Sequence, residues 1–266
     1  MNNKLENKSV KMARCLITKP TQYDITLQKL FYITIASASI NYNLPLKPKN
    51  AIAVKKEDVF RLIDVNCRDK YSRYRAMFDK LSKESFFSFG KNENYTSGHI
   101  FPKVKGQKHY WYVFVDEEYL PIIQDISNNY VQLLLDDVIT FRSKFSMMIY
   151  QNLLSLYNIQ DPEHKENIRT ADYTTKQLKD LLGLSVDDYV RKDGSFGRGV
   201  FENRCIIRAV KEINEKSKLI RNLTWTKEYT GKHVSKYVFT YQVDDIDRYK
   251  YGEESYQKLL QCPKTK

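Results

Sequence analysis

The pattern of residues 173–241 constrains the fold more than any other part of the 266-residue chain. Thr174 and Thr175 can each cap the start of a helix. Three leucines follow on one helical face: Leu178, Leu181 and Leu182. Gly183 comes next, and glycine is the usual residue at the left-handed position that ends a helix. These signals predict a short helix that ends at Gly183.

A longer amphipathic helix is predicted over about Val200–Lys216, after a polar turn at residues 193–197. At about 100° per residue, its apolar side chains share one side of the helix, and three basic side chains lie within about 60° of each other on the opposite side. The apolar set is Ile206, Ala209, Val210 and Ile213, and the basic set is Arg204, Arg208 and Lys211. One face would pack, and the other would carry a basic stripe.

Two strands are predicted next, at Leu219–Tyr229 and Ser235–Gln242, joined by the glycine-containing tip Thr230–His233. Three aromatic residues alternate along the second strand, as the buried face of a wing strand would: Tyr237, Phe239 and Tyr241. Helix, turn, helix and basic hairpin is the order of a winged helix.

The charge of this region favours nucleic acid as its partner. A charged helix face is most often simply solvated. Here, however, residues 197–236 hold ten Lys and Arg against four Asp and Glu, which is +6 of the chain's net +12. Clustered cations of this kind release counterions from a phosphate backbone. The residues predicted to contact DNA in this half are Arg198, Asn203, Arg204, Arg208, Lys211, Lys227, Lys232, His233 and Lys236.

These residues also carry a family resemblance. The resemblance is carried by the run from Tyr173 to Gly183, by Tyr189, by the Ala-Val-Lys-Glu-Ile-Asn run that starts at Ala209, and by Trp225. With these residues, the region resembles the C-terminal half of the initiator replication (Rep) proteins of iteron-type bacterial plasmids. Upstream, residues 130–158 are similar to the strand and linking helix that open that half. The resemblance covers residues 130–242 well and the N-terminal half loosely.

The resemblance implies a fold and a set of partners. The fold is α+β, with two tandem winged-helix domains that form a pseudo-repeat. Members of the family bind short direct repeats of double-stranded DNA at the plasmid origin as monomers and repress their own gene as dimers. The implied function is a plasmid replication initiator that assists origin opening and recruits host proteins such as a helicase or the chromosomal initiator.

The N-terminal half repeats the layout of the C-terminal half. An apolar-rich helix is predicted at Thr26–Ile40. It is followed by a strand (51–54), two helices (57–63 and 68–81), two wing strands (85–89 and 110–115) and a closing helix (117–126). A long hairpin over residues 90–108 would form the wing. On the predicted helix 68–81, the buried face is predicted to consist of Tyr71, Tyr74, Phe78 and Leu81. The residues predicted to contact DNA are Arg68, Ser72, Arg73, Arg75, Lys103 and Lys105.

The chain therefore divides into four predicted parts: a flexible basic arm (1–19), an N-terminal winged-helix domain (20–126), a C-terminal winged-helix domain (130–242) and a polar tail (243–266). The seam between the domains is predicted at residues 127–129. Residues 121–190 carry six basic against ten acidic residues, which favours packing and a dimer surface over DNA contact.

Composition sets further limits. A hydrophobic content of 42% is enough for real cores. The sequence has no apolar run long enough for a membrane helix and no signal-peptide core, so a cytoplasmic protein is expected. The four cysteines are far apart and have no His at zinc-like spacing, so we expect reduced thiols, no metal and no cofactor: Cys15, Cys67, Cys205 and Cys262.

Enzymatic functions are disfavoured. Rolling-circle initiators need a His-x-His metal pair, which the four histidines do not form: His99, His109, His164 and His233. The sequence also has no G-x-x-x-x-G-K-[ST] phosphate loop. A tyrosine recombinase is the remaining enzymatic alternative, although its Arg-x-x-Arg or His-x-x-Arg pattern is absent. A winged-helix transcriptional repressor without origin function is the other alternative, because it would need the same DNA contacts.

Overall fold

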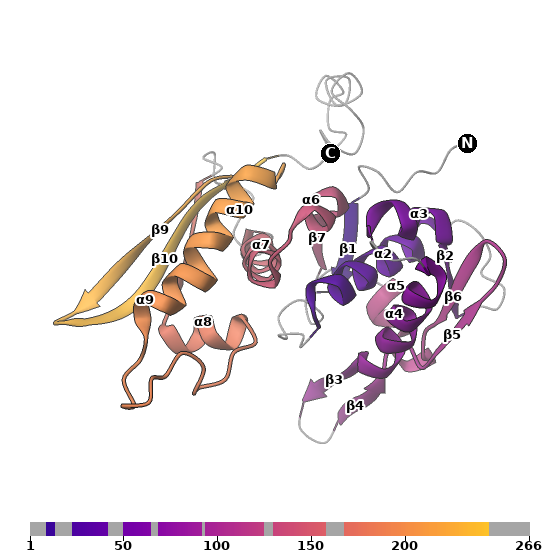
Figure 1. Ribbon diagram of the computed structural model, residues 1–266, viewed down its shortest axis with the longest axis horizontal. Coiled ribbons are helices and arrows are strands. Elements are labelled where there is room, and N and C mark those ends of the chain that lie inside the picture. The colour runs from indigo at the N-terminus through magenta and orange to yellow at the C-terminus, as the bar shows by residue number, and fades with distance from the viewer. Residues whose placement is uncertain are drawn as a thin grey trace, which may run out of the picture.

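A computed structural model describes residues 9–13, 23–41, 50–64, 69–91, 94–124, 130–157 and 168–244. Figure 1 shows an N-terminal domain on the right, a C-terminal domain on the left, and two helices between them, α6 (Leu135–Thr140) and α7 (Lys144–Tyr157). Several sequence predictions lie outside the described residues: those for Arg68, the seam at 127–129, the tail beyond residue 244, and Cys15, Cys67 and Cys262.

The C-terminal domain packs against α7 and follows the predicted order. Its elements are β8 (Ile168–Tyr173), α8 (Thr175–Leu181), α9 (Arg198–Phe201), the π-helical segment η2 (Glu202–Ile207), α10 (Arg208–Lys216), β9 (Ile220–Thr230) and β10 (His233–Val243). The segments α9, η2 and α10 form one continuous helix, which we call the recognition helix. The three strands form a sheet in the order β8-β10-β9.

Local chemistry explains the ends of these elements. The hydroxyl of Thr174 accepts a hydrogen bond from the backbone N–H of Gln177, whose side chain accepts one from the N–H of Thr174, so α8 starts with a complete capping box. Gly183 follows α8 with φ of 62°, a left-handed conformation that costs glycine little. Gly231, with φ of 60°, turns the β9–β10 hairpin. His233 already pairs with Thr230, so the tip is tighter than predicted.

The N-terminal domain has the same topology. Its matching elements are α2 (Ile25–Asn41), β2 (Ala51–Lys55), α3 (Lys56–Leu62), α4 (Lys70–Glu84), β5 (Lys103–Gly106) and β6 (Tyr110–Phe114). The sheet order is β2-β6-β5, in which the first strand pairs with the last and the last with the middle one, as in β8-β10-β9. The pseudo-repeat of two winged helices predicted from the sequence is thus present in the strand order itself.

The wing of the N-terminal domain differs from the prediction. A single hairpin over residues 90–108 is wrong, because β3 (Phe86–Lys91) pairs with β4 (Asn94–His99) and not with β6, whereas β5 pairs with β6. Ile100 and Phe101 are buried between the two hairpins. The N–H of Phe101 donates to the hydroxyl of Ser85. This buried anchor divides the segment into an inserted hairpin, β3–β4, and the wing, β5–β6.

The sequence analysis missed a strand pair that joins the N-terminal arm to the first strand of the predicted C-terminal domain. Ser9–Ala13 falls inside the arm predicted to be flexible, but it forms β1, which pairs antiparallel with β7 (Tyr130–Leu134). The prediction therefore does not hold for these five residues. The closing helix near residue 120 is a 3-10 turn, η1 (Glu117–Tyr119), followed by α5 (Leu120–Gln124).

The core contains most of the predicted side chains. Tyr237, Phe239 and Tyr241 are fully buried, which confirms the alternating pattern of the wing strand. On α4 the buried residues are Tyr74, Met77, Phe78 and Leu81. Tyr71 was predicted on this face but is 61% exposed. It lies in the first turn of α4, where its ring meets Phe60 edge-on at 5.2 Å and leaves most of its surface in water.

Candidate nucleic-acid interface

The recognition helix is buried with a period of four residues. Over residues 201–210 its buried side chains come in pairs that start four residues apart: Phe201 and Glu202, Cys205 and Ile206, Ala209 and Val210. Two exposed residues follow each of the first two pairs, and exposed Lys211 follows the third. An α-helix has 3.6 residues per turn, so a period of four would drift by about 40° per turn around the helix. The π-helical segment η2 has a wider turn that absorbs this drift.

As a result, the exposed side chains of the recognition helix form two rows on one face. Val200, Arg204 and Arg208 follow each other at intervals of four residues, and beside them lie Asn203, Ile207 and Lys211. All six are exposed. The structure thus brings together four of the residues that the sequence analysis singled out for DNA contact. Half-buried Arg198 lies at the start of the same helix.

The cations on this face differ in how they are paired. Within the described residues, no ion pair involves Arg204 or Arg208. Lys211 lies 3.8 Å from Glu215, and both side chains are largely exposed, so this contact contributes little. Arg204 and Arg208 therefore present their guanidinium groups to solvent, where each could form two parallel hydrogen bonds with a base edge or a phosphate.

The turn between α8 and the recognition helix is held by a buried lysine. The ammonium of Lys179 donates to the backbone carbonyls of Val186 at 2.8 Å and Asp188 at 2.5 Å. It also lies 4.7 Å from the ring centre of Phe196. These contacts satisfy a buried cation and fix the path of the turn. The sequence analysis described this turn only as polar and gave Lys179 no role.

Tyr189 joins the same turn to the recognition helix. Its backbone has φ of 64°, and its hydroxyl accepts a hydrogen bond from the thiol of Cys205 at 3.2 Å. Burial, followed by this contact, raises the pKa of Tyr189 to about 12. Tyr189 therefore stays neutral and acts as a packing and hydrogen-bonding residue. Cys205 is a buried free thiol, as the sequence predicted.

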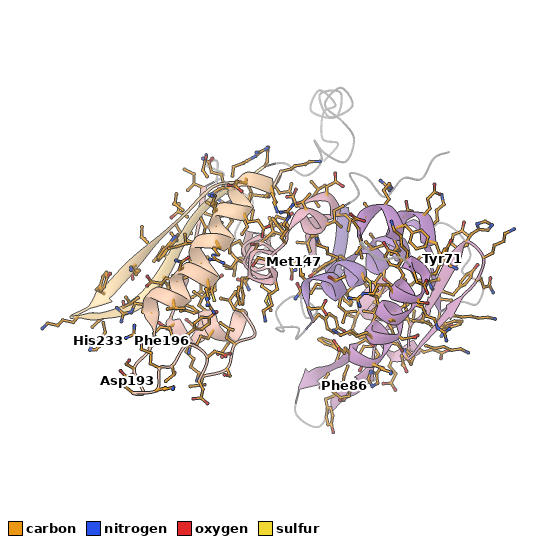
Figure 2. All side chains as sticks on the ribbon, viewed as in Figure 1. Tyr71, Phe86, Met147, Asp193, Phe196 and His233 are labelled. Atoms are coloured by element: carbon orange, nitrogen blue, oxygen red, sulfur yellow. The ribbon has the colours of Figure 1, made fainter. Side chains whose placement is uncertain are left out.

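Two further cations lie in this turn. Arg191 and Lys192 are exposed. The sequence analysis did not include them, although their charge next to a predicted recognition helix was a usable signal. Asp193 caps the turn by accepting from the N–H and hydroxyl of Ser195 at 2.9 and 2.6 Å. Figure 2 shows Asp193 and His233, on the turn and the hairpin tip, along the lower left edge of the domain.

The wing places its predicted contact residues in different surroundings. Lys232 and His233 are exposed at the tip. Lys236 forms an exposed ion pair with Asp172 at 2.6 Å. Lys227 is only 28% exposed and lies 3.1 Å from the buried carboxylate of Glu202. The geometry favours Lys232 and His233 as contact groups, because they have no ion pair within the described part of the chain, whereas Lys227 already has an internal partner.

On the N-terminal domain, the predicted residues lie on two neighbouring elements. Ser72, Arg73 and Arg75 are exposed on α4, and Arg75 makes a long contact of 3.9 Å with Asp79. The strand β5 packs beside α4 and carries exposed Lys103 and Lys105. These five residues thus come from adjacent parts of one surface, although their charge is less concentrated than on the recognition helix.

Glu212 attaches the recognition helix to the helices between the domains. Its carboxylate accepts from the N–H groups of Arg142 at 2.7 Å and Ser143 at 3.1 Å, just before α7, and from the hydroxyl of Ser146 at 2.6 Å. The ammonium of Lys216 lies at 2.5 Å. Burial acts to raise the pKa of Glu212, but these hydrogen bonds outweigh it and hold the pKa below its usual value. Sequence reasoning missed this contact.

A second buried carboxylate fixes the junction between the recognition helix and the wing. Asp137 of α6 accepts from the hydroxyl of Ser217 at 2.7 Å, the N–H of Lys218 at 2.9 Å and the N–H of Leu219 at 3.2 Å. Burial raises the pKa of Asp137, and the hydrogen bonds only partly offset that effect.

The N-terminal domain reaches the same region through α2, which packs against α6. The pKa of Lys29 on α2 is lowered by burial and by the nearby positive charge of Lys216, while Glu212 acts in the opposite direction. The three charged groups are therefore close enough to affect one another across the boundary between the two domains.

Other types of site are not found in the part of the chain that the structure describes. There, no group of three or more His, Cys, Asp or Glu side chains is placed to hold a metal ion. None of the helices described is long and apolar enough to cross a membrane.

Two tandem winged helices, with an exposed basic recognition helix in the second, define a DNA-binding protein of the winged-helix class. Family models agree. The model described as "Initiator Replication protein, WH1" matches residues 9–154, and the one described as "Initiator Rep protein, WH2" matches residues 174–241. The chain belongs to the family of plasmid replication initiator proteins. The family resemblance and the two winged helices predicted from the sequence are thereby confirmed.

Comparison with one solved structure gives the same fold. The structure described as "Pi initiator protein in complex with iteron DNA" superposes with a TM-score of 0.71 at 18% identity, over 90% of this chain and 99% of that one. Domains 2 and 3 of RctB match with a TM-score of 0.44 at 12% identity, over 82% of this chain and 80% of theirs. No curated protein matches the sequence.

Proposed function

We propose that this protein starts plasmid replication by binding repeated DNA sites at the origin. The recognition helix enters the major groove, the β9–β10 tip holds the phosphate backbone, and the α4–β5 surface of the N-terminal domain contacts DNA beside it. The bound protein then assists the opening of the origin and recruits host replication proteins, such as a helicase or the chromosomal initiator, in the bacterial cytoplasm. It acts without catalytic chemistry of its own. Membership of the initiator family and the iteron complex of the Pi initiator support this proposal.

The observation that carries the proposal is the exposed face of the recognition helix. Arg204 and Arg208 are one interval of four residues apart, exposed, and without an ion pair among the described residues. A guanidinium group matches O6 and N7 of guanine with two hydrogen bonds, and each such pair discriminates against a wrong base by about 1–3 kcal/mol. A solvated helix face would not need this alignment.

The test is Arg204→Ala and Arg208→Ala, measured on repeats found next to the coding gene and on random DNA. Each variant should lose roughly 1–3 kcal/mol on the specific site and far less on random DNA. Arg221→Ala is the matched control, because this exposed arginine lies at the opposite end of β9 from the wing tip. Equal losses on both DNAs would reduce Arg204 and Arg208 to phosphate contacts.

A second experiment separates initiation from repression alone. A plasmid that carries only the gene and its adjacent repeats should replicate with the wild-type protein and fail with Arg208→Ala. If the wild type represses its own gene but cannot maintain the plasmid, the protein is a repressor. Incubation with supercoiled repeat DNA and magnesium should leave the DNA unbroken. Nicks or covalent adducts would instead reveal strand-transfer chemistry.

A further inference from the structure

Two apolar side chains lie exposed on the DNA-facing rows of the recognition helix. Val200 is 48% exposed and Ile207 is 47% exposed. Ile207 lies between Asn203 and Lys211 in one row, with Arg204 and Arg208 in the row beside it. An exposed apolar side chain is ordinary at a protein surface. These two are notable because they share their rows with Asn203, Arg204, Arg208 and Lys211, which are predicted to contact DNA.

Charge complementarity indicates which partner covers them. An apolar protein surface laid over Ile207 would also strip water from the neighbouring guanidinium groups of Arg204 and Arg208, which is costly for unpaired charges. The major groove of DNA offers both kinds of contact at once. Its phosphates and guanine edges accept hydrogen bonds from arginine, and the 5-methyl group of thymine is an apolar group on its base edges.

We propose that Val200 and Ile207 recognise thymine methyl groups in the major groove. This inference rests on the proposed binding of DNA by the recognition helix and specifies which bases it reads. The two residues are seven positions apart, which is at most about 10 Å at the α-helical rise of about 1.5 Å per residue, because the wider turn of η2 lies between them. Base pairs follow at about 3.4 Å. The two thymines should therefore lie about three base pairs apart, with the base read by Arg204 between them.

The test removes the methyl group from the DNA and the apolar side chain from the protein. The full chain first selects its site from a pool of random duplexes, and each thymine of that site is then replaced by uracil, which lacks only the methyl group. Burial of one methyl group corresponds to about a fourfold change in Kd. We expect two positions, about three base pairs apart, where uracil weakens binding of the wild type about fourfold.

The variant Ile207→Ala should lose the effect at one of these positions and keep it at the other, and Val200→Ala should do the reverse. Alanine is a good helix former, so both exposed substitutions should preserve the helix. Ile168→Ala is the matched control, because Ile168 is also 47% exposed but lies on β8. It should keep both uracil effects.

Two results would overturn the inference while leaving the proposed function intact. One is a well-defined selected site at which no uracil weakens binding more than twofold. The other is a uracil effect that stays the same in Ile207→Ala and Val200→Ala. If the wild type selects no sequence at all, the proposed function itself fails, and the inference fails with it.

Discussion

Replacement of Asp137 should loosen the junction between the recognition helix and the wing. This carboxylate is 1% exposed and accepts from the hydroxyl of Ser217 and the N–H groups of Lys218 and Leu219. Ser217 and Leu219 are themselves buried. In Asp137→Ala these two donors lose their acceptor in a place that solvent barely reaches. Each such donor costs about 1–3 kcal/mol, so the free energy of unfolding should fall by about 3 kcal/mol.

Two variants calibrate this value in urea unfolding experiments. Asp137→Asn keeps one acceptor oxygen and should lose less, about 1–2 kcal/mol. Asp136→Ala alters the neighbouring carboxylate of α6, which lies 2.9 Å from the ammonium of Lys218, a side chain that is 43% exposed. A pair this close to solvent contributes up to about 1 kcal/mol. Hydrogen exchange should accelerate at the amide of Leu219 in Asp137→Ala and stay slow in Asp136→Ala.

The pH dependence gives an independent check. The pKa of Asp137 is raised in the folded protein, so its contribution to stability is fully present below its ordinary pKa of about 3.9 and is lost as the pH rises through the folded value. The stability gap between the wild type and Asp137→Asn should therefore narrow as the pH rises above about 4. A loss below about 1 kcal/mol in Asp137→Ala, or a gap that widens with pH, would refute this account of the junction.

Three further predictions concern the domain contacts, the wing and assembly. Glu212→Gln should lower the free energy of unfolding at pH 7 by about 1–2 kcal/mol. The pKa of Glu212 is lowered in the folded protein, so its stabilisation is present above its usual pKa and is lost as the pH falls. Urea unfolding should therefore show the stability difference between the wild type and Glu212→Gln shrinking in acid. Lys232→Ala should weaken binding to all DNA sequences alike and flatten the plot of log binding constant against log salt concentration by about one unit of slope. Lys227→Ala should mainly lower stability, because Lys227 is paired with Glu202. An unchanged slope in Lys232→Ala would place the tip away from DNA. Dimers should bind an inverted site and monomers direct repeats. Light scattering across a dilution series should therefore show two oligomeric states, and footprinting should show that they protect different sites. A single state with identical footprints on both sites would contradict this prediction.

The parts of the fold that the sequence predicted are those set by local chemistry. Thr174 and Gln177 are three residues apart, and their capping box fixes the start of α8 without help from the rest of the chain. Gly183 and Gly231 mark positions with positive φ. The alternation of Tyr237, Phe239 and Tyr241 specifies the buried face of β10. Each of these signals lies within a few residues of the structure it determines.

The missed features depend on contacts between distant segments. The pairing of β1 with β7 joins residues more than a hundred positions apart, and neither strand carries a turn signal that leads to the other. The inserted hairpin depends on Phe101 reaching the hydroxyl of Ser85. Glu212 and Asp137 look like ordinary charged residues in the sequence. Only the folded chain shows that Glu212 accepts hydrogen bonds from the N–H groups just before α7, and that Asp137 accepts them from the N–H groups just after the recognition helix.

The π-helical segment is intermediate between the features that the sequence predicted and those that it missed. Its signal is present in the sequence, but its cause is a contact between distant segments. The apolar residues of the recognition helix recur every four positions, a spacing that a regular α-helix cannot keep on one face. Glu202, the first residue of η2, accepts from the ammonium of Lys227 on β9 at 3.1 Å and from the hydroxyl of Tyr237 on β10 at 3.2 Å. Both wing strands therefore hold the helix at the point where its turn widens. We therefore expect a displacement of the wing to move the rows that carry Arg204 and Arg208 as well, because Glu202 connects the helix to both strands.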